Sequence, residues 1–104
     1  MAAWYRARGY DVLDRNWRVR EGELDLVVRR GRTIVFCEVK TRRGDAFGTP
    51  FEAVTPTKQR RLRTLALRWL AEHDHRGPSL RFDVAAVRVA ADGTAEIEVR
   101  PGAF

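Results

Sequence analysis

Asp25, Glu38 and Lys40 are the residues whose types and spacing suit hydrolytic chemistry. Asp25 lies in the stretch GELDLVV (residues 22–28), while Glu38 and Lys40 end the stretch TIVFCEVK (residues 33–40). The intervening RRGR supplies a turn, so the two stretches predict a β-hairpin over residues 23–40. Because side chains alternate between the faces of a strand, pairing of the arms brings the three charged groups to one end of the hairpin. Charged groups among apolar neighbours are costly unless they hold something, and we predict a divalent metal ion.

The elements around this hairpin follow from apolar periodicity and turn residues. We expect, in chain order, a helix end (2–8), a strand irregular at its middle (10–19), the hairpin (23–40), a loop (41–51), the main helix (55–74) and two strands (80–89 and 95–100). The predicted fold is α/β in the order α-β-β-β-α-β-β, a central mixed sheet with a helix on each side. The loop would hang over the site, where it could contact phosphates or be an ordinary connector.

Composition favours one domain over residues 1–104 with a polyanionic partner. A chain of 104 residues buries roughly 60–70% of its unfolded surface, which is enough for one core. The 20 basic residues outnumber 14 acidic ones, and only Lys40 and Lys58 are not arginine. Guanidinium groups bind phosphate through paired donors, although a basic protein without such a partner is the alternative. No apolar run approaches the roughly 20 residues of a membrane span, and no signal peptide is visible. We therefore expect a cytoplasmic protein without a membrane segment.

Asp25 followed, after a hairpin, by Glu38-Val39-Lys40 resembles the active-site signature of the PD-(D/E)xK nuclease superfamily. Over most of its length the chain also resembles the YraN family of uncharacterised bacterial proteins, which is similar in fold to archaeal Holliday-junction resolvases. The matching segments are residues 8–10, 15–18, 22–26, 38–42, 47–50, 53–54 and 81–84. The resemblance implies a restriction-endonuclease-like fold and metal-dependent cleavage of DNA, including branched structures. Related sequences place a Gly-Glu pair before the counterparts of Ala2 and Ala3, and this chain has no equivalent glutamate.

For such a nuclease we assign Asp25, Glu38 and the Val39 carbonyl as ligands of Mg²⁺ (or Mn²⁺), which prefers oxygen ligands and keeps several waters. Lys40 would orient or deprotonate the attacking water, or stabilise charge on the phosphate. Glu23 shares the face of Asp25 and could act behind the direct ligands or bind a second metal ion. A solvated hairpin end with a weak Glu–Lys pair is the alternative.

The start of the main helix follows the loop after Lys40, so its polar residues could reach the site. Gln59 lies near the core-facing side there, and related nucleases often carry a Lys-Gln pair at this position; a solvated glutamine is the alternative. The predicted nucleic-acid contacts are Arg42, Arg43, Lys58, Arg60, Arg61 and Arg63. Phosphate contacts position a protein without reading sequence, so we expect structure-selective binding, to DNA rather than RNA. A junction resolvase cuts two strands symmetrically, which implies a two-fold homodimer.

Two other functions stay open from the sequence. A nucleic-acid-binding module without catalysis would use the same basic surface and no metal, and the short first helix favours it. A scaffold could instead dock a replication or repair protein through the edge strand over residues 95–100.

Overall fold

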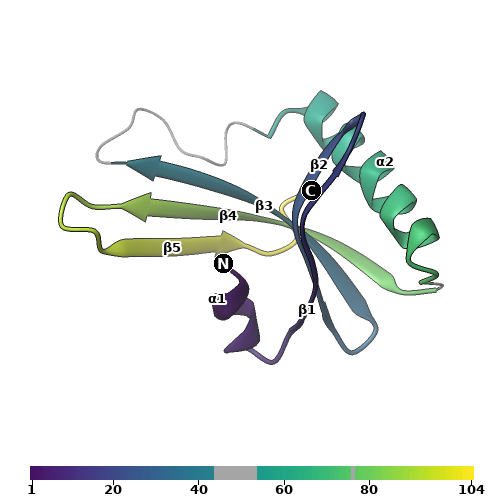
Figure 1. Ribbon diagram of the computed structural model, residues 1–104, viewed down its shortest axis with the longest axis horizontal. Coiled ribbons are helices and arrows are strands. Elements are labelled where there is room, and N and C mark those ends of the chain that lie inside the picture. The colour runs from purple at the N-terminus through teal and green to yellow at the C-terminus, as the bar shows by residue number, and fades with distance from the viewer. Residues whose placement is uncertain (44–53, 76) are drawn as a thin grey trace.

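The computed structural model describes residues 1–43, 54–75 and 77–104. Its elements are α1 (Ala2–Arg6), β1 (Asp11–Val19), β2 (Gly22–Arg30), β3 (Thr33–Arg43), α2 (Pro56–Glu72), β4 (Ser79–Val89) and β5 (Ala95–Arg100). This order confirms the predicted α/β class and its α-β-β-β-α-β-β arrangement (Figure 1). None of the helices in these described ranges is long and apolar enough to cross a membrane.

The five strands form one sheet in the order β1-β2-β3-β4-β5. The pairs β1–β2, β2–β3 and β4–β5 are antiparallel, whereas β3 and β4 are parallel, so the sheet is mixed as predicted. A parallel pair requires a crossover connection, because the chain must return to the same end of the sheet. The segment that contains α2 makes this return, and it brings the start of α2 towards the later part of β3.

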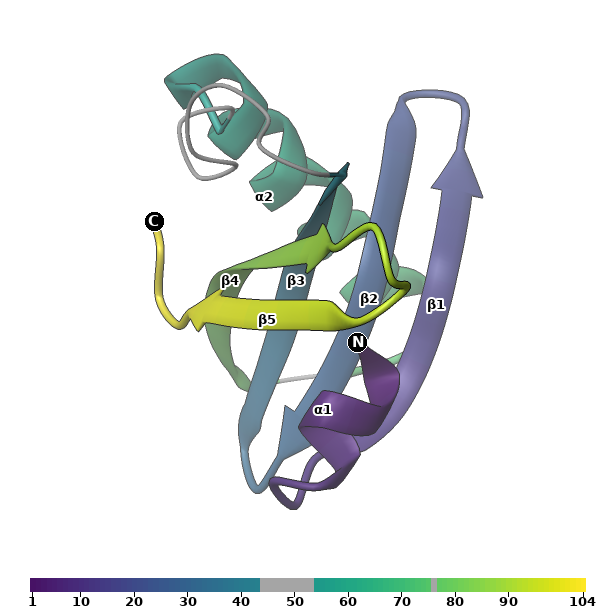
Figure 2. The same ribbon diagram turned by 90° about the vertical axis from the view of Figure 1, so that its left-hand side faces the viewer.

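The two helices cover opposite faces of the sheet, which lies between α1 and α2 in Figure 2. The expected apolar stripe of α2 is fully buried; it comprises Leu62, Leu65, Ala66, Trp69 and Leu70. This stripe packs on Val27, Ile34 and Phe36 of the sheet. On the other face, Tyr5 of α1 packs with residues that alternate with these along the strands, including Val28 and Val35. Successive apolar side chains of β2 and β3 therefore point to opposite faces of the sheet and pack into two separate cores.

The predicted loop boundary at residue 41 is wrong. β3 continues to Arg43, because Thr41, Arg42 and Arg43 pair with Val87, Arg88 and Val89 of β4. This pairing is a long-range interaction that the charged composition of the segment does not reveal. The remainder of the predicted loop, residues 44–51, lies outside the described residues.

A buried carboxylate ties α1 to the sheet. Asp83 of β4 is fully buried and accepts hydrogen bonds from the Tyr5 hydroxyl (2.7 Å), Arg81 Nε (2.8 Å) and the Gly102 backbone N–H (3.0 Å). A buried charge is tolerated when it is paired and hydrogen-bonded in this way. Asp83 thus fixes α1 and the C-terminal segment on β4, which positions the α1 side of the candidate site.

Candidate active site

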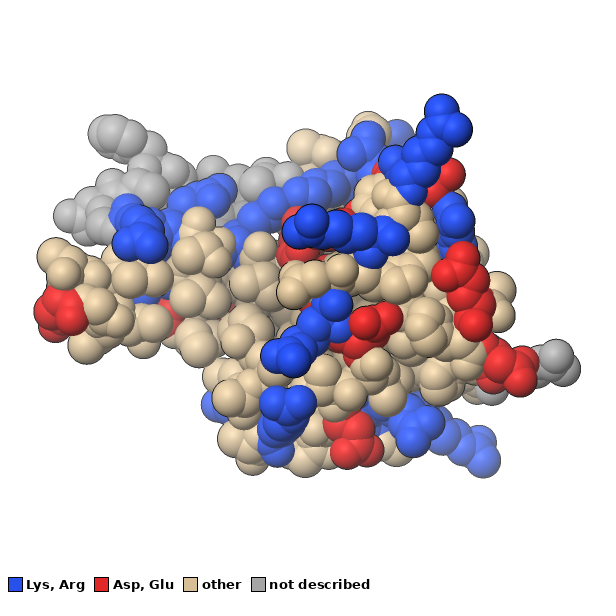
Figure 3. All heavy atoms as spheres, viewed as in Figure 1, with Lys and Arg blue, Asp and Glu red and all other residues tan. Residues whose placement is uncertain are grey.

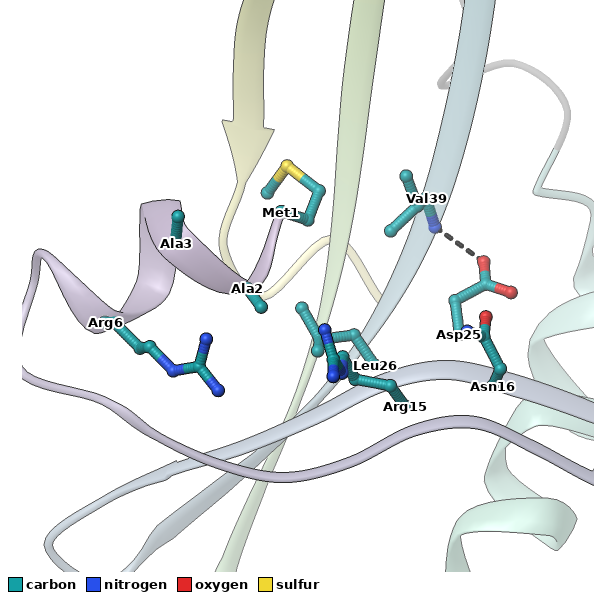
Figure 4. A pocket seen from close by; sticks show the side chains of 9 residues that line it. All are labelled: Met1, Ala2, Ala3, Arg6, Arg15, Asn16, Asp25, Leu26 and Val39. Carbon is teal, nitrogen blue, oxygen red and sulfur yellow. Dashed lines mark hydrogen bonds between the residues drawn. The ribbon is translucent and has the colours of Figure 1, made fainter.

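The site begins where the backbone pairing of the hairpin ends. Residue pairs of β2 and β3 run from Arg30–Thr33 to Leu26–Cys37. Asp25 and Glu38 are the next residue on each strand, past the last pair. There the Asp25 carboxylate replaces the backbone ladder, because its Oδ2 accepts a hydrogen bond of 2.8 Å from the Val39 N–H (Figure 4). The structure therefore brings Asp25 to the segment Glu38–Lys40, as expected from the predicted hairpin. The contact that joins them is the hydrogen bond from the Val39 N–H. The ligand role of the Val39 carbonyl stays a prediction.

Both lysines of the chain converge on Glu38. Its Oε1 lies 3.1 Å from Lys40 Nζ and 2.9 Å from Lys58 Nζ. The Glu38 side chain is 10% exposed, so water screens these ion pairs less than it would at an open surface. Lys58 reaches the site from the first turn of α2, where the Thr55 hydroxyl caps the helix by accepting a 3.2 Å hydrogen bond from the Lys58 N–H.

The protonation of the site follows from its burial and its like charges. Burial raises the pKa of Asp25; the hydrogen bond from Val39 opposes this, and repulsion from Glu38 and Glu23 adds to it. Burial also lowers the pKa of Lys40, helped by the neighbouring Lys58 and opposed by Glu38. For Lys58 burial acts in the same direction, but ionic contacts outweigh it and raise the pKa. Burial and the second ammonium group therefore act on Lys40 in the same direction, against Glu38.

Two cavities meet at Asp25. The first, of about 250 Å³, opens between the hairpin and α2, and it is lined by Gly22, Glu23, Asp25, Glu38, Lys58, Arg61, Leu62 and Leu65. The second, of about 530 Å³, lies on the α1 side, and its lining includes Arg6, Arg15, Asn16, Asp25 and Val39 (Figure 4). Asn16 has a positive φ of 52°, which is uncommon for a residue other than glycine. The carboxylate of Asp25 is thus accessible from both sides of the sheet end.

The carboxylates supply the kind of oxygen atoms that a metal ion would need. Oδ2 of Asp25 accepts the hydrogen bond from the Val39 N–H, the Glu23 side chain lies within hydrogen-bonding range of the Asp25 carboxyl, and both ion pairs of Glu38 use Oε1. Mg²⁺ commonly takes one or two carboxylates and completes its octahedron with water and substrate oxygens, so Asp25 and Glu38 suffice as its protein side-chain ligands. The described ranges contain no group of three or more His, Cys, Asp or Glu residues that could hold a metal by themselves. The donor set fits an exposed, partly hydrated Mg²⁺ rather than an all-protein cage.

The remaining predicted site residues lie at the margin. Glu23 is paired with Arg18, whose Nε lies 2.6 Å from Glu23 Oε2, and it acts on Asp25 by repulsion. Gln59 Nε2 donates a 3.2 Å hydrogen bond to the Val54 carbonyl at the start of α2.

The predicted nucleic-acid contacts divide into two groups. Lys58 and Arg61 line the cavity between the hairpin and α2. Arg63 instead lies over the rings of Phe82 and Phe104, at 5.7 and 5.6 Å from their centroids. The Arg60 guanidinium donates a hydrogen bond to the Thr57 hydroxyl, and the Arg42 guanidinium donates one to the Thr41 carbonyl. Basic side chains follow the upper side of the view in Figure 3, over the region of β3 and α2.

Sequence reasoning missed part of this arrangement. It did not foresee the ion pair of Lys58 with Glu38, and the predicted phosphate contact of Lys58 stays a prediction. The available signal was that an arginine-rich chain keeps only two lysines. It also missed Arg6, Arg15 and Asn16 beside Asp25. The irregularity predicted in the first strand marked this region of β1, where the register shifts between Val12 and Asp14.

Comparison with known proteins gives one consistent family. A family model described as "Uncharacterised protein family UPF0102" matches residues 1–87. A UPF0102 protein of Frankia casuarinae is 54% identical over 98 residues, covering 94% of this chain and 83% of that protein. One of Beutenbergia cavernae is 56% identical over 95 residues, covering 91% of this chain and 80% of that protein. One of Rhodococcus opacus is 47% identical over 103 residues, covering 99% of this chain and 87% of that protein.

Proposed function

The chain belongs to uncharacterised protein family UPF0102, and from the geometry of its site we propose that it is a metal-dependent nuclease that cleaves DNA. The observation that carries this proposal is the convergence of Asp25, Glu38 and both lysines at the end of one hairpin. Two largely buried carboxylates close together attract a divalent cation. Two ammonium groups beside them attract the phosphate on which that cation acts.

Each residue has a distinct part in this reaction. Asp25 and Glu38 would hold Mg²⁺, which would supply Lewis-acid activation of the phosphate and of the attacking water. Asp25 is held in place for this task by the Val39 N–H. Lys40, whose pKa is lowered, takes the proton of the attacking water or directs that water to phosphorus. Lys58 and Arg61 bind the non-bridging phosphate oxygens from α2.

The proposed substrate is DNA recognised by shape, including branched structures. Arginine contacts to phosphates position a duplex without reading its bases. The net charge of +6 supports a contact that weakens as salt rises, because bound cations are released from DNA. Symmetric cleavage of a junction would require a second copy of the chain, since each domain carries one such site.

A second candidate is a nucleic-acid-binding module that does not cut. The specific observation in its favour is that Lys40 and Lys58 already neutralise Glu38. The lack of a three-residue ligand cluster in the described ranges points the same way. This alternative predicts DNA binding that is indifferent to Mg²⁺.

A cleavage assay with matched variants separates the two functions. We expect wild-type protein with Mg²⁺ to cut a labelled four-way junction, and Asp25→Asn to abolish cutting while leaving binding in EDTA intact. Lys40→Met should slow cutting by about 10²-fold or more, the usual contribution of a proton-transfer group. Glu96→Gln removes the same charge from the exposed strand β5 and should cut like wild type. Equal cutting by Asp25→Asn and wild type would overturn the proposed site, and binding without cutting by the wild type would establish the non-catalytic module.

A further inference from the structure

A second basic cavity lies at the β2–β3 turn, away from the carboxylates. It has a volume of about 420 Å³ and is lined by Arg29, Gly31, Arg32, Ile34, His75, Gly77 and Pro78. Its walls come from the β2–β3 turn and from His75, Gly77 and Pro78, which lie between α2 and β4; the β2–β3 turn and the end of α2 are both on the right-hand side of Figure 1. Ile34 and Glu38 are four residues apart on β3, a separation of about 13 Å.

The walls of this cavity are fixed to one another and to the core. The Ser79 N–H donates a 2.9 Å hydrogen bond to the Arg32 carbonyl, which joins the turn to the start of β4. The His75 N–H donates to the Leu70 carbonyl at 3.1 Å. The His75 ring stacks on the buried Trp69, with ring centroids 5.3 Å apart and planes 11° apart. The cavity is therefore preformed, as binding sites for small charged groups usually are.

The arginines at this end of the molecule sort into two kinds. Arg30 donates to the Arg8 carbonyl and lies over the Tyr10 ring, and Arg81 is paired with Asp83. By contrast, the guanidinium groups of Arg29 and Arg32 make no hydrogen bond or ion pair with any described residue. Asp11 is the cross-strand neighbour of Arg29 in β1, yet the described lining of the cavity includes no Asp or Glu.

Backbone as well as side chains is accessible in this cavity. Gly31 and Gly77 have positive φ values of 61° and 69°, a conformation that glycine adopts without strain. Nothing in the described structure lies within 4 Å of the position that a Cβ would take at either residue. A ligand can therefore approach both turns closely, and two uncompensated guanidinium groups beside open backbone favour an oxyanion.

We propose that this cavity binds a phosphate group of the DNA backbone at a distance from the phosphate that is cleaved. The inference rests on the proposed function and adds a second anchoring point to it. The cavity lies about 13 Å from Glu38 along β3, so the phosphate that it binds is a different one from the phosphate that is cleaved. Two anchors separated in this way fix the direction of the duplex across the sheet.

The test compares two double variants that remove the same charge. The cavity variant, Arg29→Gln/Arg32→Gln, removes both guanidinium groups from the cavity. The control variant, Arg20→Gln/Arg88→Gln, removes two exposed arginines elsewhere. Binding to a labelled DNA duplex is measured in EDTA over a range of salt concentrations, so that cleavage plays no part. We expect the cavity variant to bind about tenfold more weakly, since it loses charge-assisted hydrogen bonds. Its slope of log K against log salt should fall by about 0.9, the value for one phosphate contact.

The outcomes separate this inference from the proposed function. Equal losses in the two double variants would overturn the cavity as an anchor while leaving the nuclease untouched. The single variant Arg32→Gln, in the exposed turn, should show part of the loss if the double variant folds poorly. A parallel titration with inorganic phosphate follows the amide NMR signals of Gly31 and Gly77. Suppose that phosphate shifts these signals in wild type but not in the cavity variant, and that wild type does not bind DNA. The ligand of the cavity would then be a free anion and not the DNA backbone, and both proposals would be overturned.

Discussion

Glu38 is the residue on which the charges of the site converge. Its Oε1 holds the ammonium groups of Lys40 and Lys58 at 3.1 and 2.9 Å. The two lysines repel each other, and this repulsion adds to burial in lowering the pKa of Lys40. A lysine that titrates below its ordinary range is suited to accept a proton at moderately alkaline pH. In the proposed reaction, Lys58 would therefore act through Lys40 as well as through the phosphate.

Replacing Lys58 tests this coupling through the pH dependence of cleavage. In wild type we expect the rate to rise with pH and to level off above the lowered pKa of Lys40, where the amine is neutral. Lys58→Met removes the like charge beside Lys40, and this change raises the pKa of Lys40. The rise in rate should therefore move to higher pH, as measured by cleavage rates across a pH series with Mg²⁺. Lys58→Arg keeps the charge and should keep the wild-type profile. If the pH profile of Lys58→Met is the same as that of wild type, Lys58 does not influence the pKa of Lys40.

At the scale of the elements, the site depends on how α1 and α2 are held on opposite faces of the sheet. α2 is fixed by the burial of its apolar stripe against β2 and β3. α1 has only five residues, too few to be stable alone. It is held by Tyr5, which is fully buried and donates its hydroxyl to Asp83. Burial first, and then the nearby Cys37 and Asp83, raise the pKa of Tyr5, so this hydroxyl stays a donor.

Tyr5→Phe removes that donor and leaves Asp83 with fewer partners in a buried position. We expect a loss of about 1.5–3 kcal/mol in the free energy of unfolding, the usual contribution of a hydrogen bond to a charged group, because Asp83 keeps Arg81 and the Gly102 N–H. This corresponds to a decrease in Tm of several degrees, about 4–8 °C per kcal/mol for a domain of this size. Tyr10→Phe is the matched control, because the Tyr10 hydroxyl only accepts a 3.0 Å hydrogen bond from Arg81, which retains Asp83. Equal melting temperatures of Tyr5→Phe and wild type would show that α1 is held by packing alone.

Most of the architecture could be predicted because alternation and turn residues are local signals. Gly22–Arg30 and Thr33–Arg43 alternate between the two cores, and Asp92-Gly93 marks the last hairpin. The extension of β3 to Arg43 could not be predicted, since it depends on parallel pairing with a strand more than 40 residues later. The contact of Lys58 with Glu38 depends on how α2 crosses the sheet, and the Tyr5–Asp83 bond joins residues 78 positions apart. Such contacts are set by tertiary geometry rather than by local pattern.

At the scale of the whole molecule, one basic domain carries a carboxylate pair beside two lysines and, apart from it, a basic cavity at the β2–β3 turn. Its principal extents are 43 × 31 × 22 Å, so a single copy spans only a short length of duplex. Symmetric cutting of a junction would need two copies, and the homodimer stays a prediction. The basic surface accounts for affinity to nucleic acid under either proposed function, because both use the same arginines. The metal ion is what distinguishes them.

Calorimetric titration with Mg²⁺, and then with Mn²⁺, is the measurement that tests the metal site most directly. The proteins to compare are wild type, Asp25→Asn and the matched surface variant Glu96→Gln. A site formed by Asp25 and Glu38 predicts one divalent ion bound by wild type and by Glu96→Gln, with binding lost in Asp25→Asn. Absence of binding to the wild type, or equal binding by Asp25→Asn, would contradict the metal site and leave a DNA-binding domain without catalysis.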